Sequence, residues 1–276
     1  MTKLTPSATA RTLKQLMTLD GRVAVITGGA GHIATAMADA LAELGASVAV
    51  IDNRAAQAVS VAEDIARRWK VESKAFEADL ERAEDLPELS QRIREHFGRA
   101  DILINCAAFV GTSTLDGWAV PFEQQSVETW RRAVDVNLTA PFALAQAFAP
   151  DLKKSGHGTI INVASIYGIS GPDWRLYEGT KMGNPAAYAA SKGGLIQLTR
   201  WLATTLAPDI RVNAIAPGGI ERDTAEPFLS RYIARTPLGR MGTEEDLKGI
   251  AAFLASDLSA YVTGQCFAID GGWTAW

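Results

Sequence analysis

Residues 22–34 read RVAVITGGAGHIA, an apolar run that leads directly into a glycine-rich turn and then into sequence of helical periodicity. After the turn, apolar side chains recur on one helical face, at Ile33, Met37, Ala40, Leu41 and Leu44. Glycines let the backbone turn sharply and approach a phosphate, and the N-terminus of a helix offers free N–H groups. This strand–turn–helix stretch therefore predicts a nucleotide-binding unit at the start of the fold.

The same alternation of short β-branched runs and longer Ala/Leu-rich stretches continues along the chain. The predicted strands are Arg22–Thr27, Ser47–Asp52, Lys74–Ala78, Ile102–Ala107, Thr159–Ala164, Arg211–Ala216 and Cys266–Asp270. These runs are nearly continuous in apolar residues, as expected for parallel strands covered on both faces. The pattern predicts an α/β doubly wound Rossmann fold, with about seven parallel strands flanked by helices on both faces.

The chain divides into an N-terminal extension, residues 1–20, and a single predicted domain, residues 21–276. No linker interrupts the second part. The extension is either a short helix that packs on a partner subunit or a mobile arm, and we favour the arm.

The overall composition excludes several classes of protein. With 47% apolar and 21% charged residues and a net charge of −4, the chain is neither a general nucleic-acid binder nor a binder of anionic membranes. Its two cysteines imply no disulfide framework, and no clustered metal ligands are expected. No apolar stretch is long enough for a signal peptide or a membrane span. We expect a cytoplasmic protein that acts on a small molecule.

The end of the second predicted strand bears on the choice of nucleotide. Asp52 lies about 20 residues beyond the glycine turn, where a carboxylate accepts hydrogen bonds from both ribose hydroxyls of adenosine and repels a 2′-phosphate. Arg54 is the counter-argument, because a guanidinium pairs well with a phosphate. A solvated strand-end carboxylate is the plain alternative. We predict NAD as the cofactor.

A tyrosine and a lysine lie four residues apart in Tyr188-Ala-Ala-Ser-Lys192, on one face of a predicted helix. The pKa of a free tyrosine is about 10, too high for efficient proton exchange near neutrality. A nearby ammonium favours the phenolate and lowers that pKa, so the pair is a candidate acid/base device. Taken alone, the same spacing also fits a surface pair.

This Tyr-x-x-x-Lys pattern, after a glycine-rich first turn and the strand-end Ser165, strongly resembles the short-chain dehydrogenase/reductase family. The resemblance covers roughly residues 21–276. It rests on further motifs in the family's order: Thr27-Gly28-x-x-Gly31, Ala78-Asp79-Leu80, Asn105-Cys106-Ala107-Ala108, Val136-Asn137, Pro217-Gly218-Gly219-Ile220 and Asp270-Gly271-Gly272.

The resemblance implies a role for each catalytic position. Tyr188 exchanges a proton with the substrate oxygen, Lys192 lowers the pKa of Tyr188 and bonds the nicotinamide ribose, and Ser165 orients the substrate. Asn137 holds a water that links Lys192 to solvent. The implied cofactor contacts are Gly28, Gly31, His32, Ile33, Asp52, Asn53, Asp79, Leu80, Asn105, Ala107, Tyr188, Lys192, Pro217, Gly218 and Ile220.

Family members commonly form tetramers, so the resemblance also implies a homo-oligomer, a tetramer or a dimer. Trp201, Tyr261 and the tail Trp273–Trp276 suit such interfaces, although Trp201 suits a core equally well.

Several positions depart from the family pattern. His32 and Ala34 stand where the single-domain branch usually has glycines, Ala108 replaces a glycine, and Arg222 replaces a threonine near the nicotinamide.

The gap from Ser165 to Tyr188 is also about ten residues longer than usual, and the extra length lies in residues 168–185, GISGPDWRLYEGTKMGNP. This insertion either borders a polar substrate, with Arg175 or Lys181 meeting a carboxylate or phosphate, or packs against a neighbouring subunit.

The leading prediction is an oxidoreductase that transfers a hydride between NAD(H) and a secondary alcohol or ketone of a polar substrate. The glycine spacing and the insertion suggest carbohydrate-related chemistry. Two alternatives are a sugar-nucleotide epimerase or dehydratase that uses bound NAD, and a non-catalytic NAD-binding sensor.

Overall fold

A single parallel sheet organises the chain in the computed structural model, which describes residues 10–110 and 115–276. Its seven strands run in the order β3-β2-β1-β4-β5-β6-β7, and every neighbouring pair is parallel. The strands are β1 (Val23–Thr27), β2 (Ser47–Asp52), β3 (Ser73–Glu77), β4 (Ile102–Asn105), β5 (Thr159–Val163), β6 (Arg211–Pro217) and β7 (Cys266–Ile269). This confirms the predicted doubly wound Rossmann fold.

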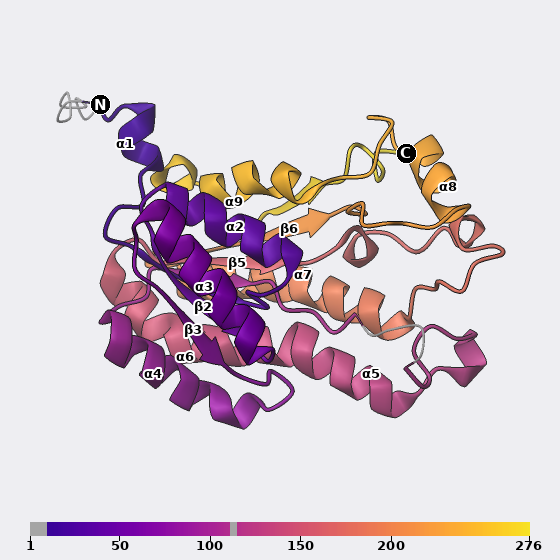
Figure 1. Cartoon of the computed structure of the whole chain (residues 1–276), viewed down its shortest axis with the longest axis horizontal. Coiled ribbons are helices and arrows are strands. Elements are labelled where there is room, and N and C mark those ends of the chain that lie inside the picture. The colour runs from indigo at the N-terminus through magenta and orange to yellow at the C-terminus, as the bar shows by residue number, and fades with distance from the viewer. Residues whose placement is uncertain (1–9, 111–114) are drawn as a thin grey trace, which may run out of the picture.

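Helices cover both faces of the sheet (Figure 1). The described helices are α1 (Leu13–Met17), α2 (His32–Glu43), α3 (Ala55–Trp69), α4 (Leu86–Phe97), α5 (Val127–Val134), α6 (Ala140–Ser155), α7 (Ala186–Leu206), α8 (Phe228–Arg235) and α9 (Lys248–Ala255). One buried core joins α2, α3 and α9 to the sheet, and a second joins α4, α6 and α7 to its other face. The two cores hold the sheet between two helical layers, as a parallel sheet requires.

The fourth strand ends earlier than the sequence predicts. Its apolar run continues to Ala107, but β4 stops at Asn105. The Thr27 hydroxyl accepts the backbone N–H groups of Cys106 and Ala107, at 3.1 and 3.2 Å. At this point the Thr27 hydroxyl takes the place of the strand-to-strand hydrogen bonds, and the chain leaves the sheet at its carboxyl edge.

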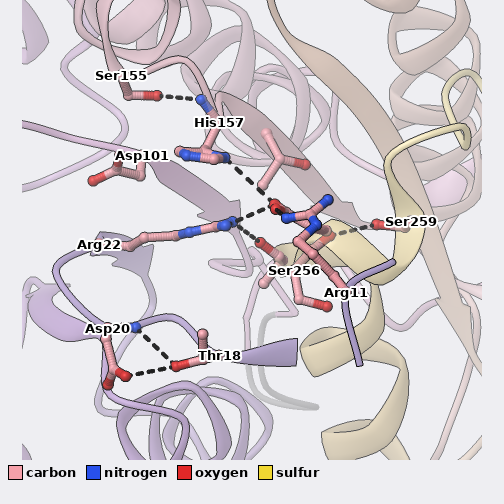
Figure 2. Close-up of polar contacts among 12 residues, drawn as sticks. Arg11, Thr18, Asp20, Arg22, Asp101, Ser155, His157, Ser256 and Ser259 are labelled. Carbon is pink, nitrogen blue, oxygen red and sulfur yellow. Dashed lines mark hydrogen bonds and ion pairs between the residues drawn. The ribbon is translucent and has the colours of Figure 1, made fainter. Parts of the chain in front are cut away.

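The N-terminal segment forms a short helix rather than the arm that we favoured. The helix α1 begins after Thr12, which caps it with a capping box, and it contacts the turn Asp257–Ser259 of the same chain. Arg11 and the buried Arg22 both pair with Asp257, at 2.5 and 2.6 Å, and His157 lies beside the same carboxylate (Figure 2). Leu19 is fully buried in the core. Residues 10–20 are therefore part of the folded unit, while residues 1–9 lie outside the described structure.

Among the residues that the structure describes, no helix is both long and apolar enough to cross a membrane.

Candidate functional site

A cleft of about 610 Å³ opens at the carboxyl ends of the strands. Its position beside β1 and β4 is where the strand order reverses and where ligands bind in open α/β sheets. Most of the predicted site residues line it: Gly28, Gly31, His32, Ile33, Asp52, Asn53, Asp79, Leu80, Ala107, Ser165, Tyr188, Lys192, Pro217, Gly218 and Ile220. Two predicted residues, Asn105 and Asn137, do not line it.

The glycine turn leaves room for a phosphate because side chains are absent there. Gly28 has a φ of +63°, and a Cβ on it would lie 2.7 Å from the Cα of Ala107. Gly31 precedes α2, and no side chain caps the N-terminal N–H groups of that helix. These backbone donors and the narrow approach fit the pyrophosphate of a dinucleotide.

At the end of β2 in the cleft, Asp52 is only 5% exposed. Its carboxylate accepts the N–H of Ala30 at 3.0 Å, and it accepts the backbone N–H, Nε and Nη2 of Arg54 at 3.0–3.2 Å. Burial alone would raise the pKa of Asp52, but the hydrogen bonds from Arg54 and Ala30 together lower it below its usual value. Asp52 is therefore a carboxylate, and Arg54 is folded onto it.

At the other end of the cleft, Ser165 follows β5, and Tyr188 lies in the first turn of α7. Lys192 follows one turn later and is 1% exposed. Its Nζ donates to the backbone oxygen of Val163 at 2.7 Å and lies 5.9 Å from the centre of the Tyr188 ring. The end of β5 and one face of α7 thus bring the hydroxyls of Ser165 and Tyr188 and the amine of Lys192 to the same part of the cleft.

The electrostatics of this group differ from the sequence prediction. Burial raises the pKa of Tyr188 above its ordinary value, and a hydrogen bond with Ser165 acts in the opposite direction. Burial lowers the pKa of Lys192 to about 8. The expected lowering of the Tyr188 pKa is not what the protein alone produces, because burial of the phenol raises this pKa more than the hydrogen bond with Ser165 lowers it.

Asn137 lies in a π-helical turn, η3 (Asp135–Thr139), between α5 and α6. Its Oδ1 accepts the N–H of Phe109 at 2.7 Å, and its Nδ2 donates to the hydroxyl of Ser191 at 3.0 Å. Ser191 in turn donates to the backbone oxygen of Tyr188. Asn137 therefore joins the segment after β4 to the first turns of α7. Ser191 was missed in the sequence, where its only signal is a small polar residue inside the Tyr-Ala-Ala-Ser-Lys run.

Asn105 belongs to the interior of the sheet rather than to the cleft. Its Nδ2 donates to Asn162 at 2.8 Å, and Asn162 donates to Thr199 at 2.9 Å. This chain of amides and hydroxyl joins β4, β5 and α7. The Asn105 side chain is buried and does not line the cleft, so its predicted contact with the cofactor stays a prediction.

The comparisons with known proteins agree with this arrangement. A family model described as enoyl-(acyl carrier protein) reductase matches residues 28–274. The chain belongs to the short-chain dehydrogenase/reductase family. It is thus an oxidoreductase by family.

Three relatives of the chain illustrate the family's range. The 3-oxoacyl-[acyl-carrier-protein] reductase FabG of Aquifex aeolicus is 32% identical, over 92% of this chain and 98% of the relative. The crystal structure of a gluconate 5-dehydrogenase from Burkholderia cenocepacia, in complex with NADP and tartrate, has a TM-score of 0.84 and 29% identity and covers 96% of this chain and 100% of its own. The crystal structure of an NAD+-bound xylitol dehydrogenase has a TM-score of 0.78 and 29% identity, and the match covers 92% of this chain and 99% of the xylitol dehydrogenase chain.

The departure at Arg222 has a structural outcome. Arg222, in place of the family's threonine, lines the cleft, and its Nε pairs with Glu244 at 2.9 Å. Cys106 also lines the cleft, and burial raises the pKa of its thiol to about 12, so the thiol stays protonated near neutrality.

Two charged residues of the insertion at residues 168–185, Asp173 and Arg175, pair within the chain. Asp173 accepts hydrogen bonds from Arg175 at 2.7 and 2.8 Å, and it also pairs with Arg235 of α8 at 3.1 Å. Arg175 lies outside the cleft lining and is bound to Asp173. The predicted role of Arg175 in meeting a substrate anion is therefore not supported by its position.

Proposed function

We propose that the protein is an NAD-dependent dehydrogenase or reductase that acts on a secondary alcohol or ketone of a polar, carbohydrate-related substrate. The observation that carries this proposal is the meeting of Ser165, Tyr188 and Lys192 at one end of a cleft whose other end presents the Asp52 carboxylate. The relatives named above for gluconate 5-dehydrogenase and xylitol dehydrogenase support a hydroxylated substrate.

The proposed roles follow from the geometry of the side chains. Tyr188 gives its hydroxyl proton to the substrate oxygen during reduction and takes it back during oxidation. Ser165, hydrogen-bonded to Tyr188, orients the same oxygen. Lys192, held by Val163 with its Nζ 5.9 Å from the centre of the Tyr188 ring, brings a positive charge that acts against the effect of burial on the phenol during the reaction. The nicotinamide, when bound, supplies the hydride chemistry.

Asn137 has a positioning role in this proposal. Its hydrogen bonds with Phe109 and Ser191 fix the first turns of α7, where both Tyr188 and Lys192 lie. The water that the family resemblance assigns to Asn137 remains a prediction.

The preference for NAD rests on Asp52. A carboxylate at this strand end accepts the ribose hydroxyls and repels a 2′-phosphate. The relatives include one structure with NADP and one with NAD+, so family membership alone does not fix the choice.

We also propose that the protein assembles as a homo-oligomer, a tetramer or a dimer. The support is a set of exposed aromatic side chains that includes Trp201, 55% exposed, and the fully exposed Tyr261. Trp273, which we expected at an interface, is instead buried and stacks on Tyr232 within its own chain. Sedimentation velocity measures the state directly, and a monomer at micromolar concentration would contradict this part of the proposal.

The main test is a dehydrogenase assay with NAD+ and NADP+ against a panel of polyols and sugar acids, followed by the absorbance of the reduced cofactor. We expect net NAD+ reduction by at least one member of the panel. Tyr188→Phe should lower the turnover by about 10²–10⁴-fold with cofactor binding retained. Tyr261→Phe, at a fully exposed tyrosine, is the matched control.

Two results of this assay would count against the proposal. Cofactor binding without net reduction across the panel would favour the sensor or a transient use of NAD. Full activity in Tyr188→Phe would remove the assigned proton donor.

A further inference from the structure

A second cavity of about 730 Å³ lies between the segment at residues 118–125 and the insertion, which we call the insertion cavity. It shares no lining residue with the cofactor cleft. The rings of Phe109, from the cleft, and Trp118, from the insertion cavity, pack edge to face at 5.1 Å and separate the two spaces. Ala186 and Ala189, on either side of Tyr188 in sequence, close the insertion cavity at the start of α7.

The walls of the insertion cavity are mostly aromatic and aliphatic. Trp118, Phe122, Trp174 and Tyr177 contribute rings, and Met182 adds a flexible thioether. Trp174 and Tyr177 pack together with ring centres 5.7 Å apart. Aromatic faces favour planar or edge-on contact with another ring, and methionine adapts to its shape. The cavity therefore suits a ligand built on one ring.

Two polar side chains of the lining are already used by the protein. Gln125 accepts the N–H of Ala186 at 3.0 Å, and Thr180 donates to the backbone oxygen of Tyr177 at 2.8 Å. Gln125 also donates through Nε2 to the backbone oxygen of Val120 at 3.4 Å, so both side chains are engaged with the backbone of the cavity wall.

Asn184 differs from them, because it is 7% exposed and its Oδ1 has no hydrogen-bond partner among the described residues. Its amide group is held by the hydroxyls of Tyr167 and Tyr177, which lie 2.6 Å from each other. A buried carbonyl oxygen without a donor is costly, so this atom favours a ligand that brings an O–H or N–H.

The rim of the insertion cavity is positively charged. Lys181 lines it, is exposed, and forms no ion pair within residues 10–110 and 115–276. An ammonium at the rim favours an anionic group on the ligand, with a modest and salt-dependent gain.

We propose that the insertion cavity binds a small aromatic acid that carries a ring hydroxyl. The ring packs between Trp118, Trp174 and Tyr177. The hydroxyl donates to Oδ1 of Asn184, and the carboxylate lies at the rim near Lys181. This site is separate from the reaction cleft and does not depend on the substrate or the cofactor proposed above.

The test is isothermal titration of the whole protein, without cofactor, with 4-hydroxyphenylacetate, phenylacetate and tyramine. We expect 4-hydroxyphenylacetate to bind about tenfold more tightly than phenylacetate, which lacks the donor for Asn184. Tyramine, which carries a cation, should bind more weakly than 4-hydroxyphenylacetate by a factor that shrinks in high salt. Asn184→Leu should abolish the difference between the two acids.

A pair of glycine variants ties the binding to this cavity. Gly183 lines it, and a Cβ there meets only Ala119, at the ordinary distance of 3.6 Å, so Gly183→Leu fills the space without a backbone clash. Gly171→Leu, in the same insertion but outside the lining and with open space around its Cβ, is the matched control. We expect Gly183→Leu to lose at least tenfold in affinity and Gly171→Leu to retain it, with circular dichroism and thermal melting confirming that both variants are folded.

Three results would overturn the proposal. They are the absence of binding at millimolar 4-hydroxyphenylacetate, equal affinity for the two acids, and unchanged binding in Gly183→Leu. A second copy of this chain that covers the cavity would give the first of these.

Discussion

Replacing Asp52 by alanine should change the cofactor preference of the enzyme. The carboxylate of Asp52 already accepts four hydrogen bonds, three of them from Arg54, which fills its capacity. To accept the adenosine ribose hydroxyls it must release part of Arg54. The substitution removes the acceptor and frees the guanidinium, which is 52% exposed at the cleft.

The magnitude follows from these contacts. Hydrogen bonds to a charged group contribute about 1.5–3 kcal/mol. Because the ribose hydroxyls replace Arg54 rather than bind a bare carboxylate, we take the lower end, and NAD+ should bind about tenfold more weakly. For NADP+, two like charges about 5 Å apart repel by about 3 kcal/mol at an effective dielectric constant of about 20, and Arg54 offsets part of this. Removing the repulsion should strengthen NADP+ binding at least tenfold.

The assay is titration of NAD+ and NADP+ into the wild type and Asp52→Ala, followed by quenching of tryptophan fluorescence. The ratio of the two dissociation constants should change by about a hundredfold. Glu77→Ala is the matched control, because Glu77 pairs with Asp52 across β2 and β3 but does not line the cleft. Unchanged NAD+ affinity in Asp52→Ala, or an NADP+ preference in the wild type, would refute the reasoning.

Three further outcomes are expected from stability and binding measurements. Burial lowers the pKa of Lys192 from 10.5 to about 8, so the unfolded chain binds more protons between these values and the free energy of unfolding rises with pH across this window, by up to about 3 kcal/mol. Urea unfolding at several pH values should show this rise in the wild type and lose it in Lys192→Met; equal slopes would contradict it. Gly28→Ala puts a methyl group 2.7 Å from a backbone atom at a φ of +63°, which should cost about 1–3 kcal/mol of stability and weaken NAD+ more than tenfold, as melting and titration report. Asp257→Ala leaves the buried Arg22 unpaired (Figure 2) and should lower the unfolding free energy by about 3 kcal/mol, whereas a change below about 1 kcal/mol would show that the pair is dispensable.

The strands and the glycine turn were predictable because their signals are local. A continuous apolar run bounded by turn residues specifies a buried parallel strand whatever surrounds it. The end of β4 was not predictable from local sequence. The backbone N–H of Cys106 donates to the hydroxyl of Thr27 in β1, which lies 79 residues away in sequence, and not to a backbone oxygen of a neighbouring strand. Similarly, the packing of α1 depends on Asp257, which lies near the other end of the chain.

The site was predictable where a single motif fixes both the residue types and their relative positions on one helix. Tyr188 and Lys192 share a helical face, and both reach the cleft. That the Asn105 side chain bonds Asn162 instead of lining the cleft could not be read from the sequence, because neighbouring strand residues point to opposite faces of the sheet. The predicted direction of the Tyr188 pKa shift differs from that in the folded protein. The spacing of Tyr188 and Lys192 indicates a nearby charge but does not show the burial that raises the pKa.

The insertion shows the same limit in its charges. Its sequence contains Asp173, Arg175 and Lys181, which favoured a polar substrate at this place. In the folded chain Asp173 pairs with both Arg175 and Arg235, and the lining of the insertion cavity is mainly aromatic and aliphatic, with Lys181 at its rim. A turn-rich segment has no periodicity that shows which side chains point inward. Here the ion pair between Asp173 and Arg235 of α8 fixes how the segment packs. The pairing of Asp173 with Arg175 and Arg235 therefore removes two of the three charges on which the predicted polar substrate contact rested.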